Sequence, residues 1–498
     1  MKNRITFINI IANLIQQIVT IISGFIIPKI ILTYFGSDVN GLVSSINQFL
    51  NYITLLEGGV MGVISASLYK AIVKEDNEKI SSIVNTSKTF FKKIGIIYII
   101  YSIALAIIYP IFINNSFSFE YIFTLTIILS LSLLIQYMFS LSYKTFLMAD
   151  KKIYIVSNTQ TIITILNIIL SYVSVKIYPS IHVLKLINGI LFIIQPIAFG
   201  TYVKKNYKLN KKAKKDNQLI KDRWNGFAIN LVAFIHFSTD VTILTLFTDL
   251  QTVSVYSVYA LVTSGLRAII NAISNAIIPT VGQAYAKNDE KELKTKFDLN
   301  EYIIFILVFY MFTIAALLIT PFVMIYTRGI NDANYNQPLF GVLLVISEAL
   351  YLIKLPHLNL AYSANKFKEV TIPAFIEAFI NIIVSAILVN KLGLIGVAIG
   401  TILGMAYRMM FHVKYTEKLI KGWKQINFYR KMLIFAITTI IGLCICYVIP
   451  LSEYNITSWI IHALIYMIIF EILYLVMSKI FFKQELKYIY KYFKKEKW

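Results

Sequence analysis

Apolar residues dominate the chain in fourteen long stretches that short polar connections separate. A helix that crosses a bilayer needs about 20 mostly apolar residues, and each stretch reaches that length. The connections leave no room for a soluble catalytic domain. We therefore predict an all-α integral membrane protein with about 14 transmembrane helices. The predicted spans are residues 6–34, 41–69, 94–113, 121–148, 153–177, 181–203, 224–248, 253–285, 302–327, 338–363, 370–390, 392–413, 431–450 and 457–482.

Basic residues gather in every second gap between these stretches. With the N-terminus in the cytoplasm, eight cytoplasmic segments hold 40 of the 47 Lys and Arg residues. This asymmetry follows the positive-inside rule and predicts that both termini are cytoplasmic. The net charge of +22 therefore reflects topology, and we expect no nucleic-acid partner; the basic tail after Phe482 is expected to lie against anionic membrane lipids. The eight segments are 2–4, 70–93, 144–152, 204–223, 287–296, 366–368, 408–431 and 479–497.

The chain repeats itself at an offset of about 212 to 215 residues. The loop sequence of 74–80 is echoed at 287–293, and Ala149-Asp150-Lys151 is echoed by Ala364-Asn365-Lys366. The alternative is a chance echo of short loops in a chain rich in Ile and Lys. The repeat predicts an N-terminal lobe of six helices at 1–220, a C-terminal lobe of six at 221–425, and two extra helices with a basic cytoplasmic tail at 426–498.

Because six is an even number, both lobes enter the membrane from the same side, and the repeat is parallel. Transporters built from such repeats bind their substrate between the lobes near the membrane midplane, and rocking of the lobes exposes the site to each side in turn. We therefore expect a central cavity with alternating access.

Uncharged polar side chains recur on one face of several spans. Asn13 and Gln16 lie on one face of the first span, Asn47 and Asn51 lie in the second, and Asn271 lies in the eighth. Positions three and four apart share a helix face, and polar faces in a membrane normally meet water or another helix. These five residues are candidates for the cavity wall. Hydrogen bonds that hold the helices together are the alternative.

Three cations within the spans are candidates for binding an anionic substrate. Arg267 lies near the centre of the eighth span, Lys354 near the centre of the tenth, and Lys29 in the outer part of the first. An Arg at the bilayer centre costs a few kcal/mol or more, so it needs a carboxylate, carbonyls, water or an anionic substrate. Its planar guanidinium can grip two oxygens of a phosphate. The alternative is an internal ion pair, for which Glu348 is available on the same helix as Lys354.

Candidates for ion coupling are Glu57, His236 and Asp240. The last two are four residues apart and share a face of the seventh span, where an imidazole beside a carboxylate can carry a proton. A structural hydrogen bond is the alternative for this pair. Glu57 is either a coupling carboxylate or the counter-ion of Arg267.

Sequence signatures of enzymes are missing from the chain. It contains no G-x-x-x-x-G-K-[ST] loop for ATP, no D-x-D for a metal-bound sugar nucleotide and no H-E-x-x-H. We therefore expect no catalytic residues, no cofactor and no metal site. Energy for transport must come from an ion gradient or from the concentration drop of the substrate.

Two sequence segments carry a resemblance to a known family. The first runs from Pro28-Lys29 through Tyr34-Phe35-Gly36 to Asn40-Gly41, and the second is Pro279 followed by Ala284-Tyr285-Ala286-Lys287-Asn288-Asp289-Glu290-Lys291. With two six-helix lobes and two extra helices, the chain resembles the polysaccharide transporters, or Wzx-type oligosaccharide flippases, of the MOP exporter superfamily. The resemblance covers essentially the full length.

The resemblance implies a non-enzymatic flippase in the plasma membrane of a bacterium. It implies that an undecaprenyl-diphosphate-linked oligosaccharide moves from the inner to the outer leaflet for capsule, exopolysaccharide or O-antigen synthesis, with the polymerase and chain-length proteins of the pathway as candidate partners. In such flippases, cavity cations come from helices one, two and eight. Lys29 and Arg267 match helices one and eight, whereas the second helix offers Glu57 and no cation.

Two other functions stay open at this point. A multidrug or cation exporter of the same superfamily would want an acidic or apolar cavity, which Arg267 and Lys354 disfavour. A membrane-embedded polysaccharide polymerase would need a catalytic carboxylate or metal motif at a membrane surface, and the sequence shows none.

Overall fold

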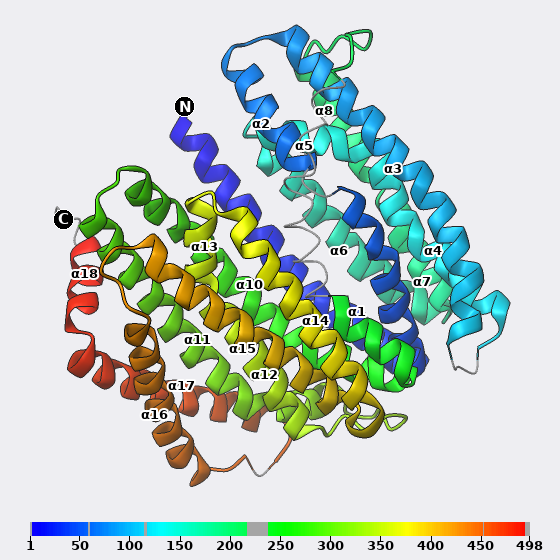
Figure 1. The fold of residues 1–498 in the computed structure, drawn as a ribbon. Coiled ribbons are helices and arrows are strands. Elements are labelled where there is room, and N and C mark those ends of the chain that lie inside the picture. The colour runs from blue at the N-terminus through cyan, green and yellow to red at the C-terminus, as the bar shows by residue number, and fades with distance from the viewer. Residues whose placement is uncertain (1, 58–59, 114–116, 217–237, 452, 494–498) are drawn as a thin grey trace. The chain divides into compact units, whose positions relative to one another are not determined.

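The computed structural model describes residues 2–57, 60–113, 117–216, 238–451 and 453–493 (Figure 1). Within these ranges every regular element is a helix. Twelve helices are long and apolar enough to cross a membrane, and Val60–Val73 and Ser238–Phe247 are shorter apolar helices. The predicted all-α membrane fold is confirmed.

Contacts divide the chain into two compact units, Met1–Ser254 and Val255–Trp498, which we call unit 1 and unit 2. The predicted lobe boundary at residue 220 falls outside the described residues, so the lobe assignment stays a prediction. His236 and most of the predicted span 224–248 also lie outside them. Unit 1 contains α1 (Lys2–Asn51), η1 (Tyr52–Glu57), α2 (Val60–Val73), α3 (Asn77–Phe112), α4 (Phe119–Ile135), η2 (Gln136–Ser140), α5 (Leu141–Ala149), α6 (Ile153–Ile177), α7 (Ile181–Leu191), α8 (Ile194–Asn206) and the helix Ser238–Phe247.

Unit 2 begins within α10 and holds the rest of the chain. Its densest helix packing joins α14 to α15, and α12 and α13 also pack against α15. The last helices, α16 and α17, pack against α11. The elements are α10 (Leu250–Ala286), α11 (Glu290–Tyr326), α12 (Pro338–Ile353), α13 (Leu355–Ser363), α14 (Phe367–Leu392), α15 (Leu394–Leu419), α16 (Gln425–Tyr447), α17 (Ile456–Phe481) and α18 (Lys483–Phe493).

The first two predicted spans differ from the observed helices. The gap predicted at 35–40 is a kink in α1, where Gly36 adopts φ 82° and ψ 179°. Only glycine reaches this backbone region without steric strain. The second predicted span, 41–69, is not one helix, because the end of α1, the 3₁₀ helix η1 and α2 share it.

Close packing explains the Asn40-Gly41 pair after this kink. A Cβ at Gly41 would lie 1.8 Å from the carbonyl oxygen of Leu250, so only glycine lets the two backbones approach this closely. Asn40 donates a hydrogen bond of 2.8 Å to Ser254 Oγ. Both contacts lie within unit 1, and they join α1 to the first turn of α10.

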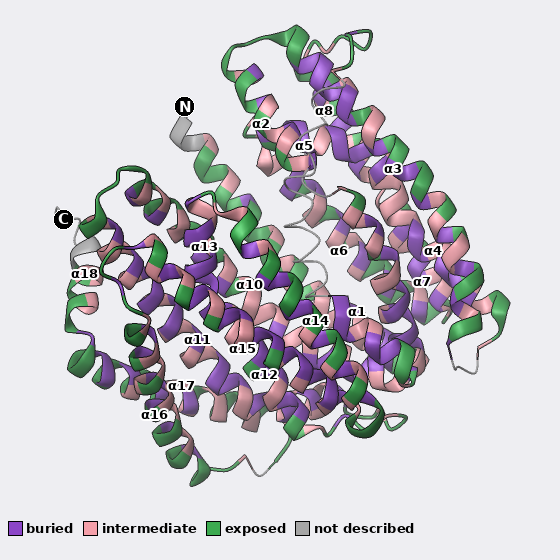
Figure 2. Cartoon of the chain, viewed as in Figure 1, coloured by how far each residue is buried: buried purple, intermediate pink, exposed green. Residues whose placement is uncertain are grey.

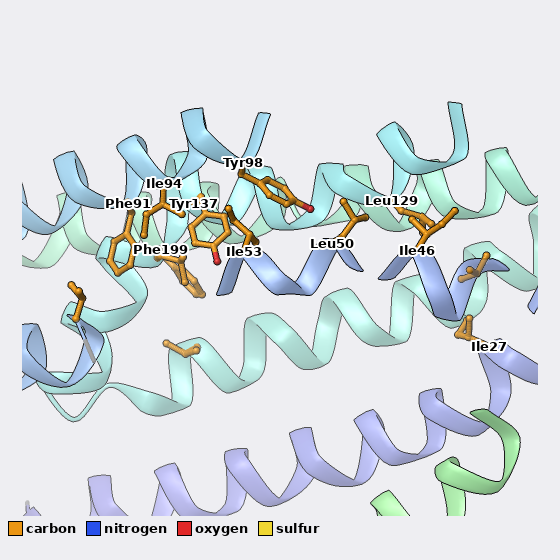
Figure 3. Packing of buried hydrophobic residues seen from close by; sticks show 14 of the residues in the cluster. Ile27, Ile46, Leu50, Ile53, Phe91, Ile94, Tyr98, Leu129, Tyr137 and Phe199 are labelled. Carbon is orange, nitrogen blue, oxygen red and sulfur yellow. The ribbon is translucent and has the colours of Figure 1, made fainter. Parts of the chain in front are cut away.

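Unit 1 has a continuous apolar core. Figure 3 shows Ile53 of η1 beside Tyr98 of α3 and Tyr137 of η2, and Ile46 of α1 beside Leu129 of α4. The two tyrosine rings lie 5.9 Å apart between their centroids. In lipid, close packing of side chains holds helices together, and the exclusion of water contributes little. The isoleucine and leucine side chains of this core supply that packing.

Many helix residues are exposed (Figure 2), and large apolar residues are numerous among them. On α17, Ile460, Leu464, Ile468 and Ile472 recur every four residues, and each is about half exposed, from 48% to 56%. The buried side chains of α17, such as Phe470, occupy the opposite face. A helix that is apolar on both faces suits a lipid environment, and the chain is a multi-pass membrane protein.

Four loops share one unusual backbone turn. Glu75, Lys151, Asn288 and Asn365 have φ between 54° and 59°, and they are the described non-glycine residues with positive φ. Glu75 and Asn288 are 213 residues apart, and Lys151 and Asn365 are 214 apart. The repeat seen in the loop sequences therefore extends to their backbone conformation.

Candidate functional site

The predicted substrate cation Arg267 lies on α10 beside an acidic residue of α12. Its Nη1 lies 2.5 Å from Oε1 of Glu348, and the two side chains are 22% and 13% exposed. The carboxylate offsets much of the cost of placing a guanidinium in the membrane. This is a different pairing from the one that the sequence offered, in which Glu348 served Lys354.

The second predicted cation, Lys354, is completely enclosed within unit 2. It lies between α12 and α13, with Nζ 3.2 Å from Sδ of Met405 and 4.5 Å from the ring centroid of Tyr351. A thioether and an aromatic face attract a cation only weakly. An anion that contacts this amine must therefore enter among α12, α13 and α15, so the place of Lys354 on a cavity wall stays a prediction.

A second buried pair in unit 2 was missed by the sequence analysis. Arg408 of α15 donates a hydrogen bond through Nη1 to Glu377 of α14, and the two side chains are 5% and 2% exposed. The charge pattern assigns Arg408 to the cytoplasmic segment 408–431, because it begins a run of basic residues. The usable signal was its place within the apolar pattern of the twelfth predicted span, with His412 one turn later.

The same helix face continues into a further group of buried polar side chains. His357 Nδ1 of α13 lies 2.8 Å from Thr416 Oγ1, and its Nε2 lies 3.1 Å from Oε1 of Glu301 on α11. Lys431 of α16 donates a 2.5 Å bond to Oε2 of Glu301. Among the described residues, the ring nitrogens of His412 have no hydrogen-bond partner. These groups join α11, α13, α15 and α16 inside unit 2.

The predicted residues of α1 have mixed surroundings. Lys29 follows Pro28 inside the helix and is half-buried; Asn13 is exposed and Gln16 half-buried. Asn9, one turn before Asn13, instead binds the α5–α6 loop, where its Nδ2 donates 2.8 Å to the Lys151 carbonyl.

Later polar residues are also partly open. Asn47 is half-buried, Asn51 is exposed, and Asn271 on α10 is half-buried one turn from Arg267. None of the five residues predicted to line the cavity is therefore fully buried. Their common cavity stays a prediction.

The predicted coupling carboxylates differ in their contacts. Glu57, at the end of η1, accepts a hydrogen bond from the Tyr137 hydroxyl and lies in the field of Lys144 on α5. Asp240 is buried in the helix Ser238–Phe247, at 6% exposure. No contact between them and His236 can be described, because that histidine is outside the described residues.

Some polar residues of the spans hold helices together, as the alternative interpretation proposed. Gln160 of α6 accepts a 2.8 Å bond from Gln195 of α8, which in turn accepts one from Ser140 of η2. Asn359 of α13 donates to Ser274 of α10 at 3.1 Å. Such bonds fix helix positions and add no open polar surface.

Comparison with known proteins identifies the fold. No protein-family model matches the chain, and no curated protein matches it in sequence. Among solved structures, the lipid II flippase MurJ in an inward closed conformation has a TM-score of 0.76 at 17% identity, covering 96% of this chain and 100% of its own. An inward-facing multidrug resistance MATE transporter of the MOP superfamily scores 0.68 at 14% identity, covering 82% and 96%. The eukaryotic MATE transporter AtDTX14 scores 0.59 at 14% identity, covering 86% and 97%. The chain therefore has the fold that the flippase MurJ and the MATE transporters share.

Proposed function

We propose that the protein is a flippase that carries a polyprenyl-diphosphate-linked oligosaccharide from the inner to the outer leaflet of a bacterial plasma membrane, with both termini cytoplasmic. The observation that carries the proposal is the extent of the structural likeness. The match to the lipid II flippase covers 96% of the chain, whereas the matches to the two MATE transporters cover 82% and 86%. The structural match to the lipid II flippase therefore covers more of the chain than the matches to the two MATE transporters do.

The charges of unit 2 support the same substrate class. A diphosphate is excluded from hydrocarbon, and a guanidinium can bind its oxygens in pairs. Arg267 is partly exposed and paired with Glu348, and a diphosphate would compete with this carboxylate for the guanidinium. The prenyl tail would stay in lipid while the head group crosses beside this pair. Lys29 and Lys354 are proposed as further cationic contacts, and Asn13, Gln16, Asn47, Asn51 and Asn271 as sugar contacts.

Replacing Arg267 with alanine should lower flipping at least tenfold, because the head group loses its paired hydrogen bonds. The assay uses proteoliposomes with a polyprenyl-diphosphate-linked disaccharide that carries a fluorophore, and the fraction of fluorophore quenched by an impermeant reductant reports flipping. Arg267→Lys should keep part of the activity, since it keeps the charge and loses the fork.

Glu348→Gln is the control that separates substrate binding from structure. If Arg267 acts only through its ion pair, the glutamine variant should lose as much flipping as Arg267→Ala. If Arg267 binds substrate, Glu348→Gln should flip at or above the wild-type rate. Wild-type flipping by Arg267→Ala would remove this residue from the mechanism. Efflux of a cationic dye without flipping of the lipid by the wild-type protein would favour the drug exporter.

Glu57, His236 and Asp240 are our candidates for ion coupling. Glu57→Gln should abolish any stimulation of flipping by an imposed proton or sodium gradient, because an amide neither releases a proton nor attracts a cation. Tyr137→Phe, which removes the hydrogen bond to Glu57 and keeps the carboxylate, should retain the stimulation. Unchanged gradient dependence in Glu57→Gln would exclude this carboxylate from coupling.

A further inference from the structure

Unit 1 contains a basic cavity that the proposed transport route does not use. Its volume is about 500 Å³, and it lies among α3, α5, α8 and the segment 207–216 that follows α8. Five lysines line it, and among the described lining residues none carries a carboxylate. Ligand pockets in proteins usually measure about 300–1,000 Å³, so the cavity is large enough for more than one phosphate group. The five are Lys88, Lys204, Lys208, Lys211 and Lys215.

The segment 207–216, which we call the basic loop, is folded onto α3 by specific bonds. Nδ2 of Asn85 lies 3.0 Å, 3.2 Å and 3.3 Å from the carbonyl oxygens of Asn210, Lys211 and Ala213. Ser82 Oγ donates to the Lys214 carbonyl at 2.6 Å. Asn85 and Ser82 share one face of α3. Their hydrogen bonds hold the backbone of the basic loop in place, and they thereby fix the positions of the Cα atoms of its lysines.

Both ends of the basic loop are also attached. The Asp216 amide donates to Thr86 Oγ1 at 2.9 Å, and the Asp216 carboxylate pairs with Lys79 at 2.7 Å. At the other end, Tyr207 donates to Asp150. Burial and this hydrogen bond raise the pKa of Tyr207, so its phenol stays a neutral donor. The carboxylates of Asp150 and Asp216 are therefore engaged with partners outside the set of five lysines.

The five lysines concentrate positive charge on a surface that also offers aromatic and hydroxyl groups. The amine of Lys88 lies 5.8 Å from the ring centroid of Tyr143, and the charges of Lys92, Lys204 and Lys211 act on it. Like charges repel, so clustering these lysines, with no carboxylate among the described residues of the cavity wall, costs stability unless an anion binds.

We propose that this cavity binds a phosphate-bearing anion with more than one negative charge, either the head group of an anionic membrane lipid or a soluble polyphosphate. Lysine suits such a ligand because its ammonium is a compact charge with three donors. The proposal does not depend on the proposed flipping reaction. None of the residues that line the cavity is among the proposed substrate contacts, and Arg267 and Glu348 belong to the other unit.

The test measures binding of inorganic pyrophosphate to the full-length protein in phosphatidylcholine nanodiscs by calorimetry. The variant Lys204→Gln/Lys211→Gln/Lys215→Gln should weaken binding at least tenfold. The matched control, Lys205→Gln/Lys212→Gln/Lys214→Gln, removes the same charge, one lysine from α8 and two from the basic loop, at residues that do not line the cavity. Its affinity should stay within twofold of wild type.

A charge-neutral variant tests the cavity itself. Thr89 lines the cavity, and Thr89→Trp should fill part of it and weaken pyrophosphate binding without changing any charge. Repeating the titration in discs that contain cardiolipin, whose head group carries two phosphates, identifies the source of the ligand. Loss of pyrophosphate binding there assigns the cavity to a lipid head group, and unchanged binding assigns it to a soluble polyphosphate. Equal losses in the two triple variants, or no saturable binding by the wild type, would overturn the proposal.

Discussion

Replacing Gly400 with alanine should destabilise unit 2 by about 1–3 kcal/mol, and replacing it with valine should prevent folding of the unit. A Cβ at Gly400 would lie 2.1 Å from Ser385 Oγ and 2.8 Å from the Ser385 amide nitrogen on α14. The side-chain atom can move, but the backbone atom cannot. Small residues at such positions allow helices in membranes to approach closely, and van der Waals packing then replaces the hydrophobic effect.

Gly400 is one of three glycines at which α15 approaches α14 closely. Gly396 and Gly404 lie one turn on either side of Gly400, and a Cβ at either would come within 3 Å of α14 backbone atoms. The free energy of unfolding in mixed micelles, measured by titration with a denaturing detergent, checks this prediction.

Gly265→Ala is the matched control for the glycine prediction. Gly265 lies in α10 of the same unit, and a Cβ there would meet no atom within 4 Å. Alanine is the better helix former, so this variant should be as stable as wild type or more stable by up to about 1 kcal/mol. If Gly400→Ala and Gly265→Ala unfold at the same detergent concentration, the close approach of α14 and α15 does not hold unit 2 together.

Replacing Lys431 with methionine should cost about 3–5 kcal/mol of stability, because it leaves a buried carboxylate without its cation. Glu301 is fully buried, and its Oε2 accepts from Lys431 at 2.5 Å. Lys431 also lies 3.8 Å from Oδ1 of Asp298, which is more exposed than Glu301 and would lose the same cation. After the substitution, the His357 imidazole would still lie 3.1 Å from Glu301. The loss of stability should appear in the same unfolding titration. Unfolding of this variant should begin at α16, which carries the substituted residue.

Two variants show whether this loss comes from the stranded charge. Glu301→Gln/Lys431→Met removes both charges and should recover most of the stability, since a buried ion pair often does little better than apolar packing. Lys366→Met breaks the exposed Lys366–Glu369 pair, whose atoms lie 3.4 Å apart, and should leave unfolding nearly unchanged. A double variant as unstable as Lys431→Met alone would show that packing of the lysine stem, rather than charge, sets the loss.

The pairing of Arg267 shows how far sequence reasoning reached into the candidate site. The sequence identified Arg267 and Glu348 as buried charges, yet it offered Glu348 to Lys354, six residues along the same helix. Six residues turn a helix well past its starting face, so those two side chains diverge. Only the packing of α10 beside α12 brings Arg267 to Glu348, at 2.5 Å.

Arg408 and Lys431 were missed for a related reason. Each stands at the edge of a basic segment, where the positive-inside rule predicts a solvated cation. The structure buries both, because Glu377 and Glu301 lie on helices that pack against theirs. The spacing of residues in a sequence indicates which face of a helix a residue occupies. It does not indicate which other helix packs against that face.

The amino-acid sequence by itself determined the helical membrane fold and the echo of loop structure. Both depend on local physics: backbone hydrogen bonds must be satisfied within each apolar stretch, and the turns at Glu75 and Asn288, or Lys151 and Asn365, form from neighbouring residues. Tertiary structure alone decided which charges pair, where the second predicted span breaks, and that lysines of a connecting segment form a cavity wall. Those outcomes require contacts between residues far apart in the chain, for which no local pattern carries the information.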